Sequence, residues 1–250
     1  MISVQNLVKR FGKITAVDGV SFTAKDGAIT GLLGHNGAGK STSLRILYGL
    51  LQADAGSASV DGIDVLKAPL VAQSLIGVMT DAHGLYPRLT AREHIEYFAR
   101  LRGMNTQLVR TRSASLIAQL GMEDIADRRA EGYSQGERMK VCLARSLVHD
   151  PQNVIMDEPT NGLDVMTTRS VRGILHGLKA ANKCVLLSSH IMQEISALCD
   201  ELIVIAAGKV LYQGGLEQLL VHTGDNNLED AFVNMTVGTM TVDPRALMKA

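Results

Sequence analysis

The stretch GLLGHNGAGKST, residues 31–42, carries the strongest structural signal in the chain. Residues 34–41 fit the pattern G-x-x-x-x-G-K-[S/T], in which glycines let successive backbone N–H groups turn inward around a phosphate. The apolar run AITGLL, residues 28–33, predicts a buried strand before the loop. A helix is expected to begin near Ser41, with its positive end toward the same anion. The stretch therefore predicts a strand, a phosphate-binding loop and a helix, in that order.

The loop supplies most of the candidate nucleotide-binding residues. Lys40 is expected to reach the β- and γ-phosphates of a nucleotide, and the Ser41 hydroxyl to coordinate Mg²⁺. The candidates are Gly34, His35, Asn36, Gly37, Ala38, Gly39, Lys40, Ser41 and Thr42.

Two further apolar runs, NVIM at residues 153–156 and CVLLSS at residues 184–189, have the texture of strands buried on both faces. Polar residues follow both runs: Asp157 and Glu158 after the first, His190 after the second. Ligands in open α/β sheets sit beyond the carboxyl ends of the strands, so these side chains are expected to meet the phosphate loop. Asp157 is suited to hold Mg²⁺, and Glu158 to act as general base on a water near the γ-phosphate. His190 is a candidate γ-phosphate contact.

The rest of the chain predicts an α/β fold built on a mostly parallel sheet. Short alternating stretches in residues 1–30 and an Asp61-Gly62 turn favour an additional antiparallel β layer. Residues 88–150 are helical in texture, with a capping box at Thr90 and Glu93 and a second helix over residues 106–120. We expect one nucleotide-binding domain over residues 1–215, with this helical subdomain inserted, and a C-terminal helical tail over residues 216–250.

Composition narrows the functional classes. The 250 residues hold 25 acidic and 25 basic side chains, aromatic residues make up 4%, and tryptophan is absent. The composition therefore does not favour nucleic acid as a partner, because basic side chains are not in excess and few aromatic rings are present to stack on bases. The three cysteines form no C-x-x-C pair, which fits a reducing compartment. No signal peptide or membrane-spanning run is evident, so we expect a cytoplasmic chain.

The segment YSQGERMKVCLARSL, residues 133–147, identifies a family. Taken alone, Ser134 and Glu137 form only a capping box at a helix start. Followed by HDPQNVIMDEPTNGLD and by SSH at residues 188–190, the segment resembles the signature of the ATP-binding cassette family, and the resemblance extends over nearly the whole chain. That signature is usually LSGGQ, from which Gln135 and Glu137 depart.

The resemblance implies a P-loop NTPase core that binds and hydrolyses Mg-ATP. Such cassettes act in head-to-tail pairs, so Ser134 and Gly136 would serve the nucleotide of a second cassette. The expected pair is a homodimer. It also implies that His190 is a catalytic switch residue and that Phe11 stacks on adenine. One chain alone would then hold half of each site.

The junction to the helical subdomain departs from the family pattern. A glutamine that touches Mg²⁺ and the attacking water is usual there, whereas this sequence has Asp81, which we retain as a catalytic and metal-binding candidate. The following LYPRLTARE resembles the segment that faces a membrane subunit, with Tyr86, Leu89 and Glu93 as groove residues. Together with the NLEDAF tail it is similar to the ATPase subunits of ABC-2-type exporters, and in particular to the sodium-export group.

The resulting expectation is the ATPase subunit of an exporter, peripheral on the inner face of the membrane and bound to a separate transmembrane permease. The alternative from another class is a soluble cassette ATPase acting in DNA repair or translation. The gap between Lys40 and Ser134 is too short for the long coiled-coil pair of repair cassettes, and translation cassettes usually come two to a chain. An importer subunit and a small-molecule phosphotransferase remain weaker alternatives, the latter because it leaves YSQGE and NGLD unexplained.

Overall fold

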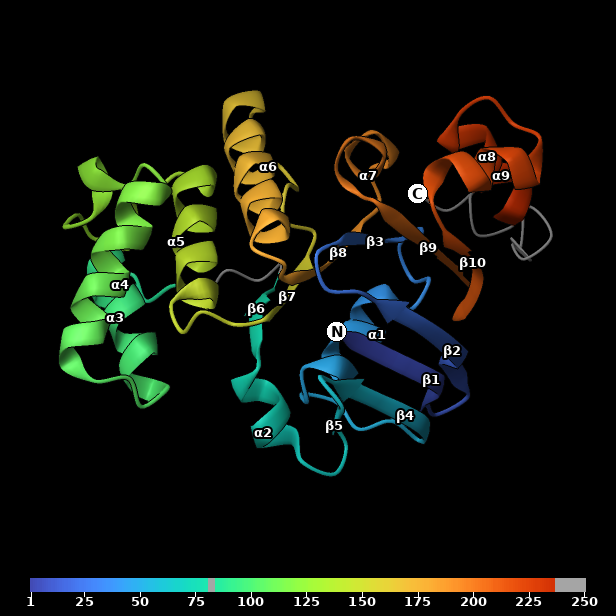
Figure 1. Ribbon diagram of the computed structural model, residues 1–250, viewed down its shortest axis with the longest axis horizontal. Coiled ribbons are helices and arrows are strands. Elements are labelled where there is room, and N and C mark those ends of the chain that lie inside the picture. The colour runs from blue at the N-terminus through green and yellow to red at the C-terminus, as the bar shows by residue number, and fades with distance from the viewer. Residues whose placement is uncertain (81–83, 237–250) are drawn as a thin grey trace.

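The computed structural model describes residues 1–80 and 84–236, arranged in two sheets and a separate group of helices (Figure 1). The larger sheet has the order β10-β9-β3-β8-β7-β6. Its strands are β3 (Ile29–Leu33), β6 (Ile76–Met79), β7 (Asn153–Asp157), β8 (Cys184–Ser189), β9 (Glu201–Ala206) and β10 (Lys209–Gly214). All neighbours pair in parallel except β9 and β10. The three strands expected from the apolar runs are therefore confirmed, and they lie side by side.

The central strands β3, β7 and β8 are buried along their whole length because both faces of the sheet are covered. On β7, Val154 and Met156 belong to one hydrophobic core, and Ile155 between them belongs to the other. Leu187 and Leu186 on β8 divide between the same two cores. This alternation follows from the two-residue period of a strand. It explains why these segments lack the polar positions of a half-exposed strand.

The antiparallel layer is confirmed as a second sheet of order β2-β1-β4-β5. It consists of β1 (Ile2–Phe11), β2 (Ile14–Ala24), β4 (Ala55–Val60) and β5 (Ile63–Asp64). The expected hairpin joins β4 to β5 through Asp61 and Gly62, whose φ angles are 48° and 79°. Positive φ at both central residues is the two-residue turn whose twist matches that of the flanking strands. Helix α1 (Lys40–Leu47) buries Leu44 and Leu47 in the core between the two sheets.

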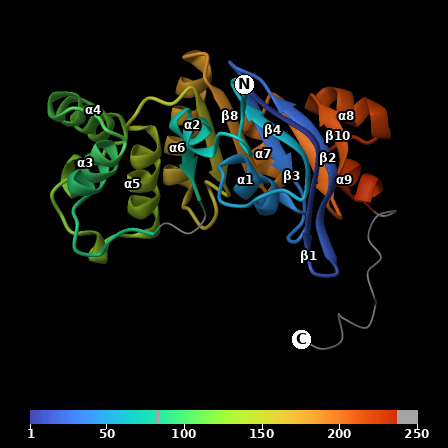
Figure 2. The ribbon, with the colours of Figure 1, turned by 90° about the horizontal axis from the view of Figure 1, so that it is seen from below.

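Three helices form the predicted helical subdomain at one end of the molecule, away from the antiparallel sheet (Figure 2). They are α3 (Ala91–Leu101), α4 (Thr106–Gln119) and α5 (Gln135–Leu147). Both predicted capping boxes are present: the Thr90 hydroxyl caps α3 with Glu93, and the Ser134 hydroxyl caps α5 with Glu137. These reciprocal bonds satisfy N–H groups that a helix start otherwise leaves without partners.

The remaining helices cover the larger sheet and the C-terminal end. They are α2 (Pro69–Ser74), α6 (Val165–Ala180), α7 (Met192–Leu198), α8 (Leu216–Thr223) and α9 (Leu228–Thr236), with short 3₁₀ turns at Glu123–Ile125 and Ala130–Gly132. Leu228 and Phe232 of α9 are buried. No helix within the described residues is long and apolar enough to cross a membrane.

Candidate functional site

The phosphate loop connects the end of β3 to the start of α1, as the sequence predicts. Gly37 and Gly39 adopt φ angles of 83° and 105°, in the left-handed region that favours glycine. Gly39 is the N-cap of α1 and packs closely on β2, where an added Cβ would lie 2.5 Å from the Ala16 carbonyl oxygen. The loop is therefore bent at two glycines and held against the antiparallel sheet, with the helix start facing the space above it.

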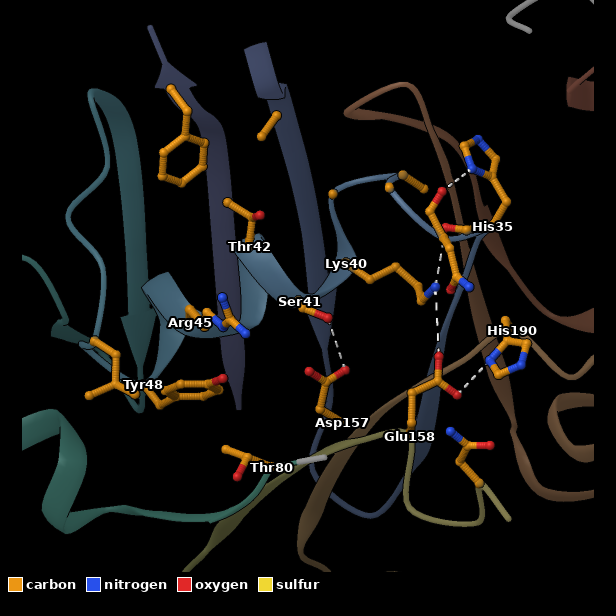
Figure 3. A pocket seen from close by; sticks show the side chains of 18 residues that line it. His35, Lys40, Ser41, Thr42, Arg45, Tyr48, Thr80, Asp157, Glu158 and His190 are labelled. Atoms are coloured by element: carbon orange, nitrogen blue, oxygen red, sulfur yellow. Dashed lines mark hydrogen bonds and ion pairs between the residues drawn. The ribbon is translucent and has the colours of Figure 1, made fainter. Parts of the chain in front are cut away.

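A cavity of about 810 Å³ opens over this loop (Figure 3). Its lining brings together most of the residues singled out from the sequence: Phe11, His35, Asn36, Gly37, Ala38, Gly39, Lys40, Ser41, Thr42, Asp157, Glu158 and His190. Gly34 does not line the cavity, but its carbonyl oxygen accepts a hydrogen bond from Lys40 Nζ at 2.6 Å. Segments far apart in the sequence therefore converge at the carboxyl ends of β3, β7 and β8.

Lys40 is the buried cation of the cavity, with its side chain 6% exposed. Besides Gly34, its ammonium group donates to the His35 carbonyl at 3.3 Å and lies 3.8 Å from Glu158 Oε1. Burial lowers the pKa of Lys40 from its ordinary value, and the nearby Glu158 and Asp157 carboxylates oppose that shift. The loop carbonyls thus aim a desolvated positive charge at the place where phosphate oxygens would sit.

Asp157 and Ser41 provide two oxygen atoms suited to a small, hard cation. Ser41 Oγ lies 3.4 Å from Asp157 Oδ1, and the Ser188 hydroxyl donates to the same carboxylate oxygen at 2.5 Å. Mg²⁺ is commonly held by one or two protein oxygens together with substrate phosphates and water. Residues 1–80 and 84–236 contain no cluster of three or more histidine, cysteine or acidic side chains placed to hold a metal. The Ser41–Asp157 pair fits Mg²⁺ carried in with a nucleotide.

Glu158 is held in an unusual backbone conformation next to His190. Its φ angle is 52°, which costs on the order of 1–3 kcal/mol for a residue other than glycine. Its N–H group lies 3.2 Å from the Ser188 carbonyl and 3.1 Å from the Ser188 hydroxyl. Its Oε2 lies 2.9 Å from His190 Nδ1 (Figure 3). The sharp turn after β7 therefore directs this carboxylate across the cavity, between Lys40 and His190.

Several residues that line the cavity were not singled out from the sequence: Ala16, Arg45, Tyr48, Leu50, Thr80 and Asn161. Arg45 and Tyr48 lie on and just after α1, on the side of the cavity near Asp157 and Thr80 (Figure 3). Burial, together with the charge of Asp157, raises the pKa of the Tyr48 phenol. Arg45 stands one helical turn beyond Ser41, and that spacing is the signal that could have drawn attention to it.

The predicted signature residues lie elsewhere. In the part of the chain that the structure describes, neither Ser134 nor Gly136 lines the cavity. The Ser134 N–H group donates to Glu137 Oε2 at 2.7 Å, and Arg128 pairs with Glu137 Oε1 at 2.5 Å. The helix start that carries the signature is therefore intact but does not contribute to the phosphate site of its own chain. Asp81 falls outside the described residues.

The predicted adenine-stacking residue, Phe11, lines the same cavity. Its ring is 49% exposed, and Lys9 Nζ lies 5.6 Å from the ring centroid. An exposed ring beside a phosphate site is available to stack on a base. Its position is consistent with that prediction.

A second cavity, of about 480 Å³, lies on the helical subdomain and is lined by Tyr86, Pro87, Arg88, Leu89 and Tyr97. We call these five residues the aromatic groove. The Tyr86 and Tyr97 rings meet edge to face with centroids 6.0 Å apart, and they are 50% and 41% exposed. Of the three residues predicted to form a groove, Tyr86 and Leu89 line it, whereas the Glu93 carboxylate accepts the Thr90 N–H as part of the capping box.

Comparison with known proteins gives relatives of the same kind. The family described as ABC transporter matches residues 17–161. The ABC transporter ATP-binding protein NatA of Bacillus subtilis (strain 168) is 41% identical, over 95% of this chain and 98% of that protein. The Nod factor export ATP-binding protein I of Ralstonia nicotianae is 38% identical, over 89% of this chain and 69% of that protein.

Among solved structures, a dimeric ATP-binding cassette in a post-hydrolysis state, bound to ADP and Pi, is similar with a TM-score of 0.79. It is 25% identical, and the likeness covers 86% of this chain and 99% of the other. The chain belongs to the ABC transporter family, and it has the α/β fold of an ABC ATPase cassette.

Proposed function

We propose that this chain is the ATP-hydrolysing subunit of an exporter and that it powers efflux through a separate transmembrane subunit at the cytoplasmic face of the membrane. The observation that carries the proposal is the single cavity in which the phosphate loop, Asp157, Glu158 and His190 converge. Relatives named for Nod factor export and for linearmycin resistance support the exporter class. The soluble alternative in DNA repair or translation has no comparable support.

The proposed chemistry is attack of water on the γ-phosphorus of ATP. Glu158 takes a proton from the water as the water oxygen bonds to the γ-phosphorus. The bond between the γ-phosphorus and the bridging oxygen breaks, and its electron pair leaves with ADP. Lys40 and the loop N–H groups hold the phosphates, and His190 holds Glu158 in place. Mg²⁺, held by Ser41 and Asp157, would neutralise phosphate charge; Asp81 remains a further candidate ligand of this ion and a candidate catalytic residue.

The test of the hydrolytic role is Glu158→Gln, which keeps the size of the side chain and removes the base. Hydrolysis should fall by about 10²- to 10⁴-fold while ATP binding persists. Glu96→Gln is a matched control, because the Glu96 carboxylate pairs with Arg100 on α3, away from the cavity. Single-turnover hydrolysis and equilibrium ATP binding are the measurements. Wild-type turnover in Glu158→Gln would remove Glu158 from the mechanism.

We further propose that two copies act head to tail, each offering Ser134 and Gly136 to the nucleotide of the other. The α5 start carries a hydroxyl and N–H groups suited to an anion. With hydrolysis blocked, ATP should accumulate a closed dimer of Glu158→Gln, visible by size-exclusion chromatography. A chain that stays monomeric with saturating ATP would contradict the pairing.

The aromatic groove is the proposed docking site of the transmembrane subunit. It exposes two tyrosine rings beside Arg88. Four of its five residues, 86–89, belong to the connection that follows β6, and the first residue of that connection, Thr80, lines the nucleotide cavity. An apolar helix face with an acidic residue toward Arg88 would suit it. Tagged Glu158→Gln should recover a polytopic membrane protein from solubilised native membranes in near-stoichiometric yield.

The control for this docking site is another exposed apolar side chain. Tyr97→Ala in the groove should lose the membrane protein, whereas Leu70→Ala on α2, where Leu70 is 78% exposed, should retain it. Equal recovery of the membrane protein with both variants would show that the docking site lies outside the groove.

For the cargo, we propose sodium. The support is the resemblance of residues 81–93 to sodium-export ATPases, and the similarity to NatA is in keeping with it. Inverted membrane vesicles containing the complex should accumulate radioactive sodium when given ATP, and vesicles with Glu158→Gln should not. Sodium uptake that is equal in the two preparations would exclude this cargo.

A further inference from the structure

A buried histidine lies directly beneath the aromatic groove. His94 on α3 is fully buried, and its ring stacks on that of Tyr86 with centroids 6.0 Å apart and an angle of 20° between the planes. The Tyr86 backbone N–H donates to His94 Nε2 at 2.8 Å, and His94 Nδ1 lies 2.8 Å from the Thr90 carbonyl oxygen. One imidazole therefore connects residues 86–89, which we call the groove segment, to the first turn of α3.

These two partners fix the protonation state of the ring. A backbone N–H can only donate, so Nε2 must accept, and a carbonyl oxygen can only accept, so Nδ1 must carry the proton. His94 is therefore neutral, with its proton on Nδ1. A second proton would place an N–H group against the Tyr86 N–H group and remove the hydrogen bond between them.

Charged neighbours act on His94 from two helices. Burial lowers the pKa of His94; the hydrogen bond to the Thr90 carbonyl and the charge of Glu93 on α3 oppose that shift, and Arg145 on α5 adds to it. Arg145 also donates to the Gly84 carbonyl at 3.4 Å and lies over the Phe98 ring. The phenol of Tyr86 is the titratable group that faces the imidazole from the groove segment.

The opposite side of the groove segment is held separately. The N–H groups of Ala130 and Glu131 donate to the carbonyl oxygens of Leu89 and Pro87, at 2.9 and 3.0 Å. The segment is thus tied through its carbonyls to the turn before α5. At Tyr86 the hydrogen bond to α3 runs through His94, beside the edge-to-face ring contact with Tyr97 on the same helix.

We propose that His94 is a positioning residue of the aromatic groove: neutral His94 holds Tyr86 in place, so that the groove can receive the transmembrane subunit. The inference rests on the proposed function of the groove and adds to it a dependence on the protonation of one side chain. Stimulation of ATP hydrolysis by the membrane partner would fall as His94 becomes protonated. Hydrolysis by the isolated chain would not change for this reason, because His94 does not line the nucleotide cavity.

The first experiment uses the isolated full chain and needs no partner. Nitrogen-15 NMR of the histidine rings should find the Nδ1–H form of His94, and hydrogen exchange should find the Tyr86 amide protected. His94→Gln can present an oxygen where Nε2 lies, whereas the shorter His94→Asn reaches only the Nδ1 position. We expect protection to persist in the first variant and to fall by about tenfold in the second. An Nε2–H tautomer, or equal Tyr86 exchange in His94→Asn and wild type, would overturn the inference.

The second experiment compares the complex purified with its membrane partner to the isolated chain, from pH 5 to pH 8. His94→Asn should lose about tenfold of the partner-stimulated hydrolysis and keep the basal rate within about twofold. His94→Gln should keep the stimulation and lose the acidic decline that wild type shows. His149→Gln, at a half-buried histidine outside the groove, is the matched control and should match wild type in stimulation.

The two proposals fail in different ways. Full stimulation in His94→Asn would overturn the role of His94 even if the groove docks the partner. If no partner stimulates the wild-type chain, the proposed function fails, and exchange at Tyr86 in the isolated chain still decides whether His94 holds the groove segment.

Discussion

Replacement of Gly39 by alanine tests the geometry of the phosphate loop. With φ at 105°, Gly39 occupies a conformation that costs an L-residue about 1–2 kcal/mol. The added Cβ would also lie 2.5 Å from the Ala16 carbonyl oxygen, a backbone atom on β2 that cannot swing away. Overpacking of this kind typically costs about 1–3 kcal/mol. Gly39→Ala should therefore lower the free energy of unfolding by about 2–5 kcal/mol.

Gly37 provides the matched control within the same loop. Its φ is 83°, but an added Cβ meets nothing within 4 Å, so Gly37→Ala should cost only about 1–2 kcal/mol. Urea unfolding measures both costs, and equilibrium titration with ATP measures affinity. Because relief of the Gly39 clash must move the loop off β2, ATP affinity should fall at least tenfold further in that variant than in Gly37→Ala. Equal losses in the two variants, in stability and in affinity, would refute the reasoning.

Three further predictions concern other parts of the molecule. Lys40→Ala removes the buried ammonium group and should weaken ATP binding by about 10²- to 10³-fold, measured by calorimetry, since charge-assisted hydrogen bonds contribute about 1.5–3 kcal/mol each. An equal mixture of Lys40→Ala and Ser134→Ala chains should recover about a quarter of wild-type hydrolysis, because half of randomly formed dimers then hold one intact site; no recovery would argue against sites shared between copies. Burial lowers the pKa of His149 to about 4, so the unfolded chain takes up its proton near pH 6.5 and the folded chain only near pH 4. His149 therefore makes its full contribution to the free energy of unfolding above pH 6.5. That contribution should fall by about 2 kcal/mol as the pH drops toward 4, after allowance for the partial exposure of His149. His149→Gln should flatten this part of the urea-unfolding profile.

The nucleotide cavity could be anticipated from the sequence because its residues follow strands that are apolar on both faces. Such strands read as uninterrupted apolar runs, and their carboxyl ends must meet at one edge of a parallel sheet. The same logic failed for β6, which is short and contains Gly77. A Cβ at Gly77 would lie 2.3 Å from the Ser146 carbonyl oxygen on α5, so the glycine reflects a close helix approach that no local pattern reveals.

The missed lining residues were missed for a related reason. Tyr48 reaches the cavity because α1 packs between the two sheets, an arrangement set by long-range contacts, whereas for Arg45 the spacing of one helical turn from Ser41 was the local signal. His94 was even harder to anticipate from the sequence. From the sequence it has no metal-ligand spacing and reads as an incidental helix residue, yet its two ring nitrogens have opposite hydrogen-bonding roles that exist only once the groove segment folds back over α3.

The position of the signature limits what one folded chain can do. Ser134 and Gly136 sit at the start of α5, whose anion-facing groups do not reach the cavity of the same chain within the described residues. Gln135 Nε2 nevertheless donates to the carbonyl oxygen of Asn161, and Asn161 lines that cavity. A movement of the loop after Glu158 therefore acts on the signature helix directly. In the proposed head-to-tail dimer, occupancy of one phosphate site would then reach the surface that closes over the other, and this contact would couple ATP binding to dimer closure.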